Sequence, residues 1–454
     1  MPIPVIAIFD VGKTNKKLLL FDEQYKLLQE ENIQLEETID EDGFPCEDIS
    51  KLTKWVRQKF SDVLSRKDID VKVVNFSAYG ASFVHLNYEL NPVAPLYNYL
   101  KPYPENLKKQ FYHTYGGESL IAKQTASPVL GSLNSGMQLY RLKYEKPEVY
   151  KQIKYSLHLP QYLSFIVSKK PATDISSVGC HTNLWDFTKN EYHDWVCREE
   201  LDKKFAPLYS GDKIIGTVND NGKMQIGIGL HDSSAAIIPY LFSFHEPFIL
   251  ISTGTWCISL NPFNHTELTD DELQQDCLCY LSYEGKPVKA SRLFAGYEHE
   301  QQIKRLAAHF NKDVGNYQSV EYNPSWVNKL SETNERSRQI SFSEIDLDEF
   351  KTYEEAYHLF MWSIVRQQIK STNLVRHGTT VKRIFVDGGF GRNLIYMKLL
   401  AKALPNIEVY AATIPQASAL GAALAIHKNW NKKPLPPDMI DLKYYANTAI
   451  DYSI

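Results

Sequence analysis

Apolar and polar positions at the start of the chain form short apolar runs separated by polar turns and one longer helical stretch. Apolar runs at 5–9 and 18–21 flank a polar turn, and this pattern predicts two strands joined by a tight turn. A helical stretch at 49–66 precedes apolar runs at 71–76 and 83–86. Strands that alternate with helices predict an α/β domain.

The same arrangement returns in the middle of the chain. An apolar run at 248–252 leads into the turn Thr253-Gly254-Thr255, and a second run follows at 256–260. This repeat predicts two related halves, each beginning with a strand, a turn suited to phosphate and a second strand.

A third turn, Asp387-Gly388-Gly389-Phe390-Gly391, lies between a buried strand predicted at 383–386 and a helix predicted at 393–404. It lacks the spacing of a dinucleotide-binding fingerprint, because Leu394 occupies the position of the last glycine. A glycine turn at the start of a helix still lets the backbone approach a ligand closely. Further helices are expected at 135–146, 147–154 and 418–426.

The first turn has residues suited to phosphate binding. Although Gly12-Lys13-Thr14 looks like the end of a P-loop, Ala7 stands where that loop needs its first glycine. The turn offers backbone N–H groups, a hydroxyl, an ammonium and a carboxylate, which suit a phosphate and its magnesium ion. These groups come from Asp10, Gly12, Lys13, Thr14 and Asn15. A solvated polar turn explains this stretch, taken alone, about equally well.

A candidate base occurs in the segment GLHDSSAA, where Asp232 precedes a run of small residues. A carboxylate at the N-terminus of a helix has a favoured charge, so we expect the pKa of Asp232 to be held low. Taken alone, an aspartate at this place is more often a helix cap than a catalytic group. We expect the neighbouring His231 to make a structural hydrogen bond.

Composition limits the class of protein. A chain of 454 residues suggests two or three domains. A formal net charge of −4 gives no reason to expect a nucleic-acid partner. We find neither a secretory signal nor an apolar stretch long enough to span a membrane. The six cysteines include no CxxC pair, and Cys277 and Cys279 read as strand thiols rather than zinc ligands. We therefore expect a cytoplasmic protein with buried thiols.

The segment 91–115 is rich in tyrosine and proline. Aromatic side chains in an irregular segment suit the apolar faces of sugar rings. Packing of a surface loop is the alternative, and we expect it for most of these tyrosines.

Taken in order, these motifs resemble the FGGY carbohydrate kinase family, within the superfamily of hexokinase, actin and the Hsp70 ATPase. The resemblance covers residues 5 to about 427 and is carried by IFDVGKTNKKLLLF, GLHDSSAA, ISTGTWCISL and VDGGFGRNLIYMKLLAKALP, together with LPQYL and CHTNLWDF. It implies an α/β fold with two RNase H-like (actin-like ATPase) domains flanking a cleft. Residues 1–240 would form the sugar-binding lobe and 241–454 the nucleotide-binding lobe.

The resemblance also implies ATP and Mg²⁺ as cofactors, with roles for particular residues. Asp10 would lie near magnesium-bound water and Asp232 would be the general base that also contacts the sugar. Lys13 departs from the family, which usually has a small residue there. The nucleotide and its phosphates would contact Asp10, Gly12, Lys13, Thr14, Asn15, Lys17, Gly254, Thr255, Gly388, Gly389 and Asn393.

The sugar end departs further from the family pattern. The family's W-x-D-x-R segment is replaced here by residues 97–101, which contain neither tryptophan nor acid. The candidates for substrate contact are Tyr79, Gly80 and Asn98. We expect Trp256, beside the second turn, to lie in the core. The motif layout is closer to the rhamnulokinase and fuculokinase branch than to glycerol kinase.

The hypothesis is an ATP-dependent sugar kinase that phosphorylates a small ketose such as L-rhamnulose, L-fuculose or xylulose. One alternative is a catalytically silent regulatory protein of the same fold that binds sugar and nucleotide. Another is an ATPase without a sugar acceptor. The expected partners are the small-molecule sugar and ATP, with no nucleic acid and no membrane, and a homodimer is left open.

Overall fold

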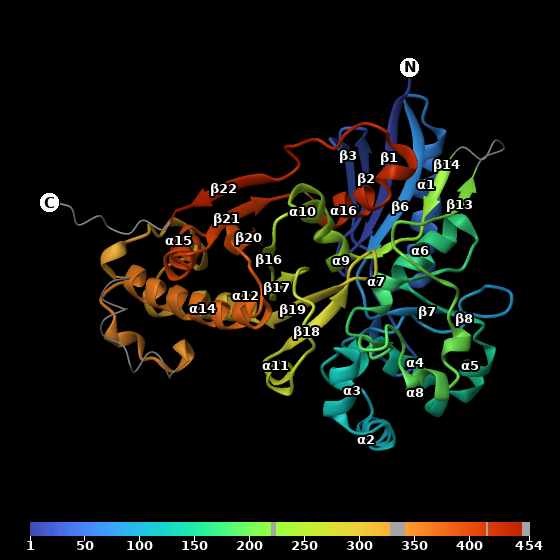
Figure 1. The fold of residues 1–454 in the computed structure, drawn as a ribbon, viewed down its shortest axis with the longest axis horizontal. Coiled ribbons are helices and arrows are strands. Elements are labelled where there is room, and N and C mark those ends of the chain that lie inside the picture. The colour runs from blue at the N-terminus through green and yellow to red at the C-terminus, as the bar shows by residue number, and fades with distance from the viewer. Residues whose placement is uncertain (219–223, 327–340, 415, 447–454) are drawn as a thin grey trace.

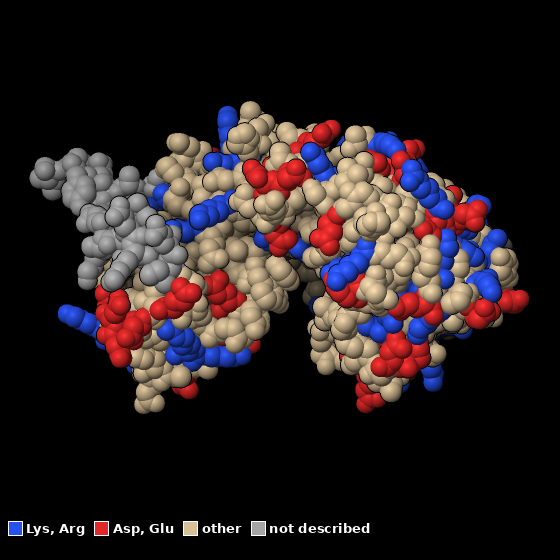
Figure 2. All heavy atoms as spheres, turned by 90° about the horizontal axis from the view of Figure 1, so that it is seen from below, with Lys and Arg blue, Asp and Glu red and all other residues tan. Residues whose placement is uncertain are grey.

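The computed structural model describes residues 1–454 except 219–223, 327–340, 415 and 447–454. The described chain forms two lobes, each built on a seven-stranded mixed sheet with helices packed on it (Figure 1). A deep cleft separates the lobes in the space-filling view (Figure 2). The predicted architecture, two α/β domains that flank a cleft, is confirmed.

The sheet of the first lobe has β1 at its centre. β1 runs antiparallel to β2 and parallel to β6, and Asp10 lies opposite Lys17 in this register. The strand order is β13-β14-β6-β1-β2-β3, with β15 also paired to β6. The strands are β1 Ile3–Val11, β2 Lys16–Asp22, β3 Leu27–Ile33, β6 Ile69–Ala78, β13 Ile214–Val218, β14 Met224–Gly227 and β15 Leu230–His231.

The sheet of the second lobe repeats this plan, in agreement with the predicted duplication. β16 runs antiparallel to β17 and parallel to β20, as β1 does with β2 and β6. The order is β18-β19-β17-β16-β20-β21-β22. The strands are β16 Phe248–Thr253, β17 Cys257–Asn261, β18 Cys277–Leu281, β19 Pro287–Leu293, β20 Arg383–Gly388, β21 Glu408–Thr413 and β22 Asp441–Tyr445.

Helix boundaries follow local signals. In α1 the side chain of Asp48 accepts hydrogen bonds from the N–H groups of Ser50 and Lys51, so it caps the helix. The helices of the first lobe are α1 Ile49–Ser65, α2 Glu105–Thr114, α3 Glu118–Thr125, α4 Ser135–Glu145, α5 Pro147–Gln152, α6 Leu159–Ser168, α7 Ile175–Val178, α8 Asp194–Arg198, α9 Asp232–Ala236 and α10 Ile238–Ser243. Those that follow are α11 Asp270–Gln274, α12 Ala295–His309, α14 Tyr353–Arg376, α15 Leu394–Ala403, α16 Ala417–Ala425 and α17 His427–Trp430.

Short strand pairs complete the first lobe. They are β4 Thr38–Ile39 with β5 Pro45–Cys46, β7 Phe83–Leu86 with β8 Tyr155–His158, β9 Thr173–Asp174 with β12 Leu208–Tyr209, and β10 Trp185–Asp186 with β11 Glu191–Tyr192. The strand and helix bounds predicted for the three turns agree with the structure to within one or two residues.

A shared core joins the two lobes. One cluster of buried side chains includes Ile8 of β1, Tyr240 of α10 and Phe248 of β16. Helix α16, late in the chain, packs against α9, β1 and β6 of the first lobe. A Cβ atom on Gly421 of α16 would lie 1.8 Å from the backbone oxygen of Ala235, so the two helix backbones nearly touch.

The C-terminal segment contacts both lobes. Asn431 donates a hydrogen bond to the backbone oxygen of Glu23 at 2.7 Å, and the Lys433 ammonium pairs with the Glu23 carboxylate at 2.6 Å. The chain then returns to the second sheet as β22, while the end of the tail lies outside the described residues. The division into 1–240 and 241–454 stays a prediction, because residues 416–433 dock on the first lobe.

Replacing Gly421 with alanine tests the approach of α16 to α9. The added methyl would overlap the Ala235 carbonyl, so we expect unfolding free energy to fall by about 1–3 kcal/mol, measured by urea denaturation. The matched control is Gly315→Ala, where no atom lies within 4 Å of the new Cβ, and a change within about 0.5 kcal/mol is expected. Equal midpoints for both variants would show that the helices are not in close contact.

Candidate active site

The first turn closes as predicted, as a strand, a turn and a strand. The Gly12 N–H donates to the backbone oxygen of Asn15 at 2.9 Å, and Thr14 is exposed at the tip. Asp10 is the second-last residue of β1, directly before the turn. The tip therefore presents a hydroxyl and backbone groups to solvent, beside a carboxylate.

Both predicted phosphate-binding lysines have carboxylate partners. The Lys13 ammonium lies 2.6 Å from Glu37, and the Lys17 ammonium lies 3.1 Å from Glu30. Lys17 also donates to the side-chain oxygen of Gln416 at 2.7 Å. Its positive charge still lowers the pKa of Asp10, so Lys17 acts on the electrostatics of the turn.

Lys16, which the sequence pattern did not single out, anchors the turn from behind. Its side chain is buried, and its ammonium donates to Glu47 at 2.9 Å and to the backbone oxygen of Lys13 at 3.0 Å. The Tyr79 hydroxyl donates to the same carboxylate oxygen at 3.4 Å. Adjacent strand residues point to opposite faces, and this alternation separates Lys16 from Lys17.

Asp10 and Asp232 interact electrostatically across the candidate site. Burial, together with the negative charge of Asp232, raises the pKa of Asp10 to about 6. The Ser418 hydroxyl donates to Asp10 at 2.9 Å and acts in the opposite direction. Ser418 belongs to α16, so the C-terminal part of the chain completes the environment of a carboxylate in the first lobe.

The expectation of a low pKa for Asp232 is wrong. Asp232 is the first residue of α9, and it accepts a hydrogen bond from the Ser233 N–H at 2.6 Å. Its side chain keeps 34% exposure, yet the surrounding protein raises its pKa to about 6. Burial disfavours the charged form, and here it outweighs the hydrogen bond and the short helix.

His231 and Gly80 pack as a unit next to Asp232. Burial lowers the pKa of His231 to about 4, so its imidazole is neutral at pH 7. A Cβ atom on Gly80 would lie 2.8 Å from Cδ2 of His231, so the glycine makes room for the ring. The structural hydrogen bond expected for His231 is present, because its Nδ1 lies 3.4 Å from the Ser234 hydroxyl. Sugar contact by Gly80 stays a prediction.

Tyrosines form one wall near Asp232. The rings of Tyr79 and Tyr99 lie 6.0 Å apart. Burial raises the pKa of Tyr99, and the charge of Asp232 adds to this effect. Tyr99 is therefore a wall residue that the sequence pattern did not distinguish from its neighbours. The Asn98 amide group donates to the backbone oxygen of Pro45 in β5, and its side-chain oxygen accepts from the Leu100 N–H, so both ends of the side chain have partners within the protein.

Most other tyrosines of the 91–115 segment pack inside the first lobe. Tyr97 and Tyr112 are buried, and the Tyr103 hydroxyl donates to the backbone of Met137 at 3.1 Å. These tyrosines therefore serve in packing, which is the alternative to sugar contact that we expected for most of them.

The second and third turns form one hydrogen-bonded unit. The Thr253 hydroxyl donates to the backbone of Asp387 at 2.6 Å and accepts from the Phe390 N–H at 3.0 Å. Gly388 has a φ of +91°, and a Cβ there would lie 2.0 Å from the Thr253 oxygen. Only glycine fits this position. Gly254 and Thr255 are exposed at the tip of the second turn.

The expectation that Trp256 lies in the core is wrong. The strand β17 begins one residue later, so Trp256 belongs to the turn and is 39% exposed. Its ring packs against Phe294 at 4.4 Å between centroids, with the Arg292 guanidinium 5.2 Å from its centre.

A cavity of about 660 Å³ opens beside these two turns. Gly254, Gly389 and Asn393 line it, with His299 and Phe390 on its wall. Its volume lies in the range of small-molecule sites. Asn393 caps α15 through the Tyr396 N–H at 3.0 Å and donates to the Tyr357 hydroxyl at 2.8 Å. Three residues predicted to bind nucleotide therefore line a single cavity.

Among the described residues there is no group of three or more His, Cys, Asp or Glu side chains placed to hold a metal ion. Five of the six cysteines are buried, while Cys197 is exposed and departs from the expectation. No helix in the described part of the chain combines the length and apolar character needed to cross a membrane.

Comparison with curated proteins finds distant relatives. A rhamnulokinase from Halalkalibacterium halodurans is 21% identical over 262 residues, which are 55% of this chain and 54% of that protein. A rhamnulokinase from Oceanobacillus iheyensis is 20% identical over 51% of each chain. The chain thus spans about half the length of the curated relatives it matches.

Solved structures share the fold over nearly the whole chain. A carbohydrate kinase from Novosphingobium aromaticivorans has a TM-score of 0.81 at 21% identity, covering 98% of this chain and 95% of that one. A xylulose kinase from Lactobacillus acidophilus has a TM-score of 0.78 at 15% identity, covering 98% and 94%.

Family models match both lobes. The model of the N-terminal domain of the FGGY family of carbohydrate kinases matches residues 5–238, and that of the carbohydrate kinase FGGY C-terminal domain matches residues 245–434. With this coverage, and with the turns and carboxylates placed as described, the chain belongs to the FGGY family of carbohydrate kinases.

Proposed function

We propose that this protein is an ATP-dependent kinase that transfers the γ-phosphoryl group to a hydroxyl of a small ketose such as L-rhamnulose, L-fuculose or xylulose. The observation that supports this proposal most is that Asp10, at the first turn, and Asp232, at the start of α9, are close enough for the charge of Asp232 to raise the pKa of Asp10. Family membership and the names of the rhamnulokinase and xylulose kinase relatives support the substrate class. Retention of both carboxylates disfavours the catalytically silent alternative.

In this proposal Asp232 is the general base. Its carboxylate takes the proton of the sugar hydroxyl as that oxygen bonds to the γ-phosphorus, and ADP leaves with the electrons of the broken P–O bond. A pKa of about 6 leaves Asp232 mostly ionised at neutral pH and a better base than an ordinary aspartate. The bond from the Ser233 N–H holds the carboxylate in place.

The turns supply the positioning that phosphoryl transfer requires. Thr14 and Thr255 are exposed at the tips of the first and second turns, where their hydroxyls and the adjacent N–H groups would bind phosphate oxygens. The cavity beside Gly389 and Asn393 would hold the adenosine. The first lobe would therefore bind the sugar and the second the nucleotide, in the cytoplasm.

Asp10 is suited to hold Mg²⁺ together with the nucleotide phosphates. Proteins commonly bind Mg²⁺ through one or two carboxylates plus substrate phosphates. Asp10 fits because it is a carboxylate at the phosphate turn whose charge is opposed by Asp232, so a cation there relieves the repulsion. The bound ion would neutralise charge on the phosphates. Ser418 and Lys17 hold the carboxylate and its surroundings.

Substituting Asp232→Asn tests the base. We expect kcat to fall by about 10²–10⁴-fold, while ADP affinity measured by calorimetry stays unchanged. Turnover is measured by a coupled ADP assay over a panel of ketoses and polyols, which also identifies the sugar. The control Asp271→Asn removes an exposed carboxylate from α11 and should be neutral. Full activity in Asp232→Asn would refute its role as base. Wild-type ADP release that no sugar increases would instead favour an ATPase.

The pH dependence of kcat/KM tests the raised pKa of Asp232. A base must be ionised, so we expect kcat/KM at saturating Mg²⁺ to fall as the pH decreases through about 6. With an aspartate of ordinary pKa as the base, kcat/KM would stay unchanged as the pH decreases to well below 5. The profile is measured between about pH 5 and pH 8, with coupling enzymes in excess. A flat profile down to about pH 5 contradicts the raised pKa.

Substituting Asp10→Asn tests the magnesium role. The neutral amide attracts the cation less, so the Mg²⁺ concentration for half-maximal turnover should rise by about tenfold or more. Sugar affinity, measured by calorimetry without nucleotide, should stay the same. If kcat falls with no shift in the Mg²⁺ titration, Asp10 serves another purpose.

A further inference from the structure

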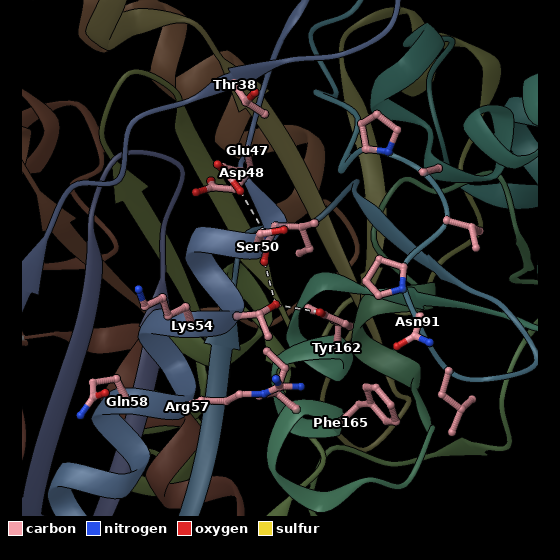
Figure 3. Close-up of a pocket in the computed structure, with 18 of the residues that line it drawn as sticks. Thr38, Glu47, Asp48, Ser50, Lys54, Arg57, Gln58, Asn91, Tyr162 and Phe165 are labelled. Carbon is pink, nitrogen blue, oxygen red and sulfur yellow. Dashed lines mark hydrogen bonds between the residues drawn. The ribbon is translucent and has the colours of Figure 1, made fainter.

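A second groove, of about 920 Å³, lies on the first lobe between α1, α6 and the loop at 90–95 (Figure 3). Neither Asp10 nor Asp232 lines it, and no residue of the second turn does. The groove is thus separate from the candidate active site.

Two cations on α1 line the groove, and in Figure 3 Lys54 points to the opposite side of α1 from Arg57. Lys54 and Arg57 stand about one helical turn apart, are exposed, and make no ion pair with a described residue. Their helix neighbours differ, because Lys51 pairs with Glu36 at 3.2 Å and Lys59 pairs with Glu31 at 2.6 Å. Figure 3 shows Arg57 extending from α1 toward the side of the groove formed by α6. An unpaired guanidinium is suited to phosphate.

The rest of the lining is suited to a polyhydroxylated molecule. The hydroxyls of Thr53 and Tyr162 lie 2.8 Å apart on facing helices, and Asn91 adds an amide from the loop. Glu47 and Asp48 lie toward the end opposite Arg57 in Figure 3. The Glu47 side chain is buried against Lys16, whereas Asp48 keeps 23% of its side chain exposed and can accept hydrogen bonds from sugar hydroxyls. The apolar side chains of Phe165 and Ile166 would face the carbon skeleton.

The groove is connected to the first phosphate turn through Glu47. Glu47 lines the groove, and its Oε2 accepts from the buried Lys16 ammonium at 2.9 Å. Lys16 in turn donates to the backbone oxygen of Lys13 in the turn at 3.0 Å. Tyr79, next to Gly80, donates to the same Glu47 oxygen. Glu47 thus connects the lining of the groove, through hydrogen bonds, to groups that position the turn.

We propose that this groove is a second, non-catalytic binding site for a sugar phosphate, with the phosphate at Arg57 and the sugar hydroxyls toward Thr53, Tyr162 and Asp48. Its occupancy changes the first phosphate turn through the Glu47–Lys16 ion pair. The site is independent of which sugar the kinase phosphorylates.

Calorimetry without ATP tests the site directly. The probes are glucose 6-phosphate, fructose 6-phosphate and glycerol 3-phosphate, with inorganic phosphate and unphosphorylated glucose as comparisons. We expect at least one sugar phosphate to bind the full chain more tightly than either comparison. The double variant Lys54→Gln/Arg57→Gln should weaken this binding by at least about tenfold, the effect of losing charged hydrogen bonds. Lys67→Gln removes an exposed charge on the same lobe outside the groove and should bind as wild type.

The outcomes separate the groove from the cleft. Binding that the double variant retains would lie elsewhere and overturn the proposal, as would no binding by any sugar phosphate. Inorganic phosphate binding as tightly as the sugar phosphates would overturn the assignment to a sugar. Hydrogen exchange should show protection at 47–57 and 90–95, with altered exchange at 12–16, in wild type and not in the double variant. Unaltered exchange at 12–16 would refute the connection to the turn. Because no measurement involves turnover, these results stand apart from the test of the kinase.

Discussion

The contact of α16 with α9 determines where the two carboxylates of the cleft lie. Gly421 brings the backbone of α16 against the carbonyl of Ala235, only three residues from Asp232. The same helix carries Ser418, which donates to Asp10. A side chain at 421 would push the helices apart and move both groups at once. Helix packing at backbone contact thus sets the geometry of the candidate site from outside it.

Burial is the second determinant of the site. Asp10 and Asp232 are close enough to repel each other, and both have pKa values raised to about 6. Their hydrogen bonds from Ser418 and Ser233 reduce this effect without cancelling it. Such a pair favours a proton or a cation nearby, and a kinase site is suited to both. The local helix terminus is a weaker influence than the loss of solvent around the carboxylate.

Local patterns predicted the parts of this fold that depend on neighbouring residues. The three turns, the helix at 49–65 and the placement of Asp232 before small residues follow from apolar spacing and glycine positions. Contacts between distant segments were not predictable in this way. Ser418 and Asp10 lie 408 positions apart, and Lys16 pairs with Glu47 across 31. The expectation of a low pKa for Asp232 was wrong for the same reason, because the burial that raises this pKa depends on the folded chain and is not visible in the local sequence.

The stretch at 434–440 ties the two lobes together after the last helix. Before this segment, Asn431 and Lys433 bind Glu23 of the first lobe; after it, β22 pairs with β21 in the second sheet. Seven residues can span at most about 25 Å, and three of these are prolines, which stiffen the chain. Leu435 and Met439 also pack against the core shared by both lobes. The length of the segment 434–440 therefore limits how far the two lobes can move apart when the cleft opens.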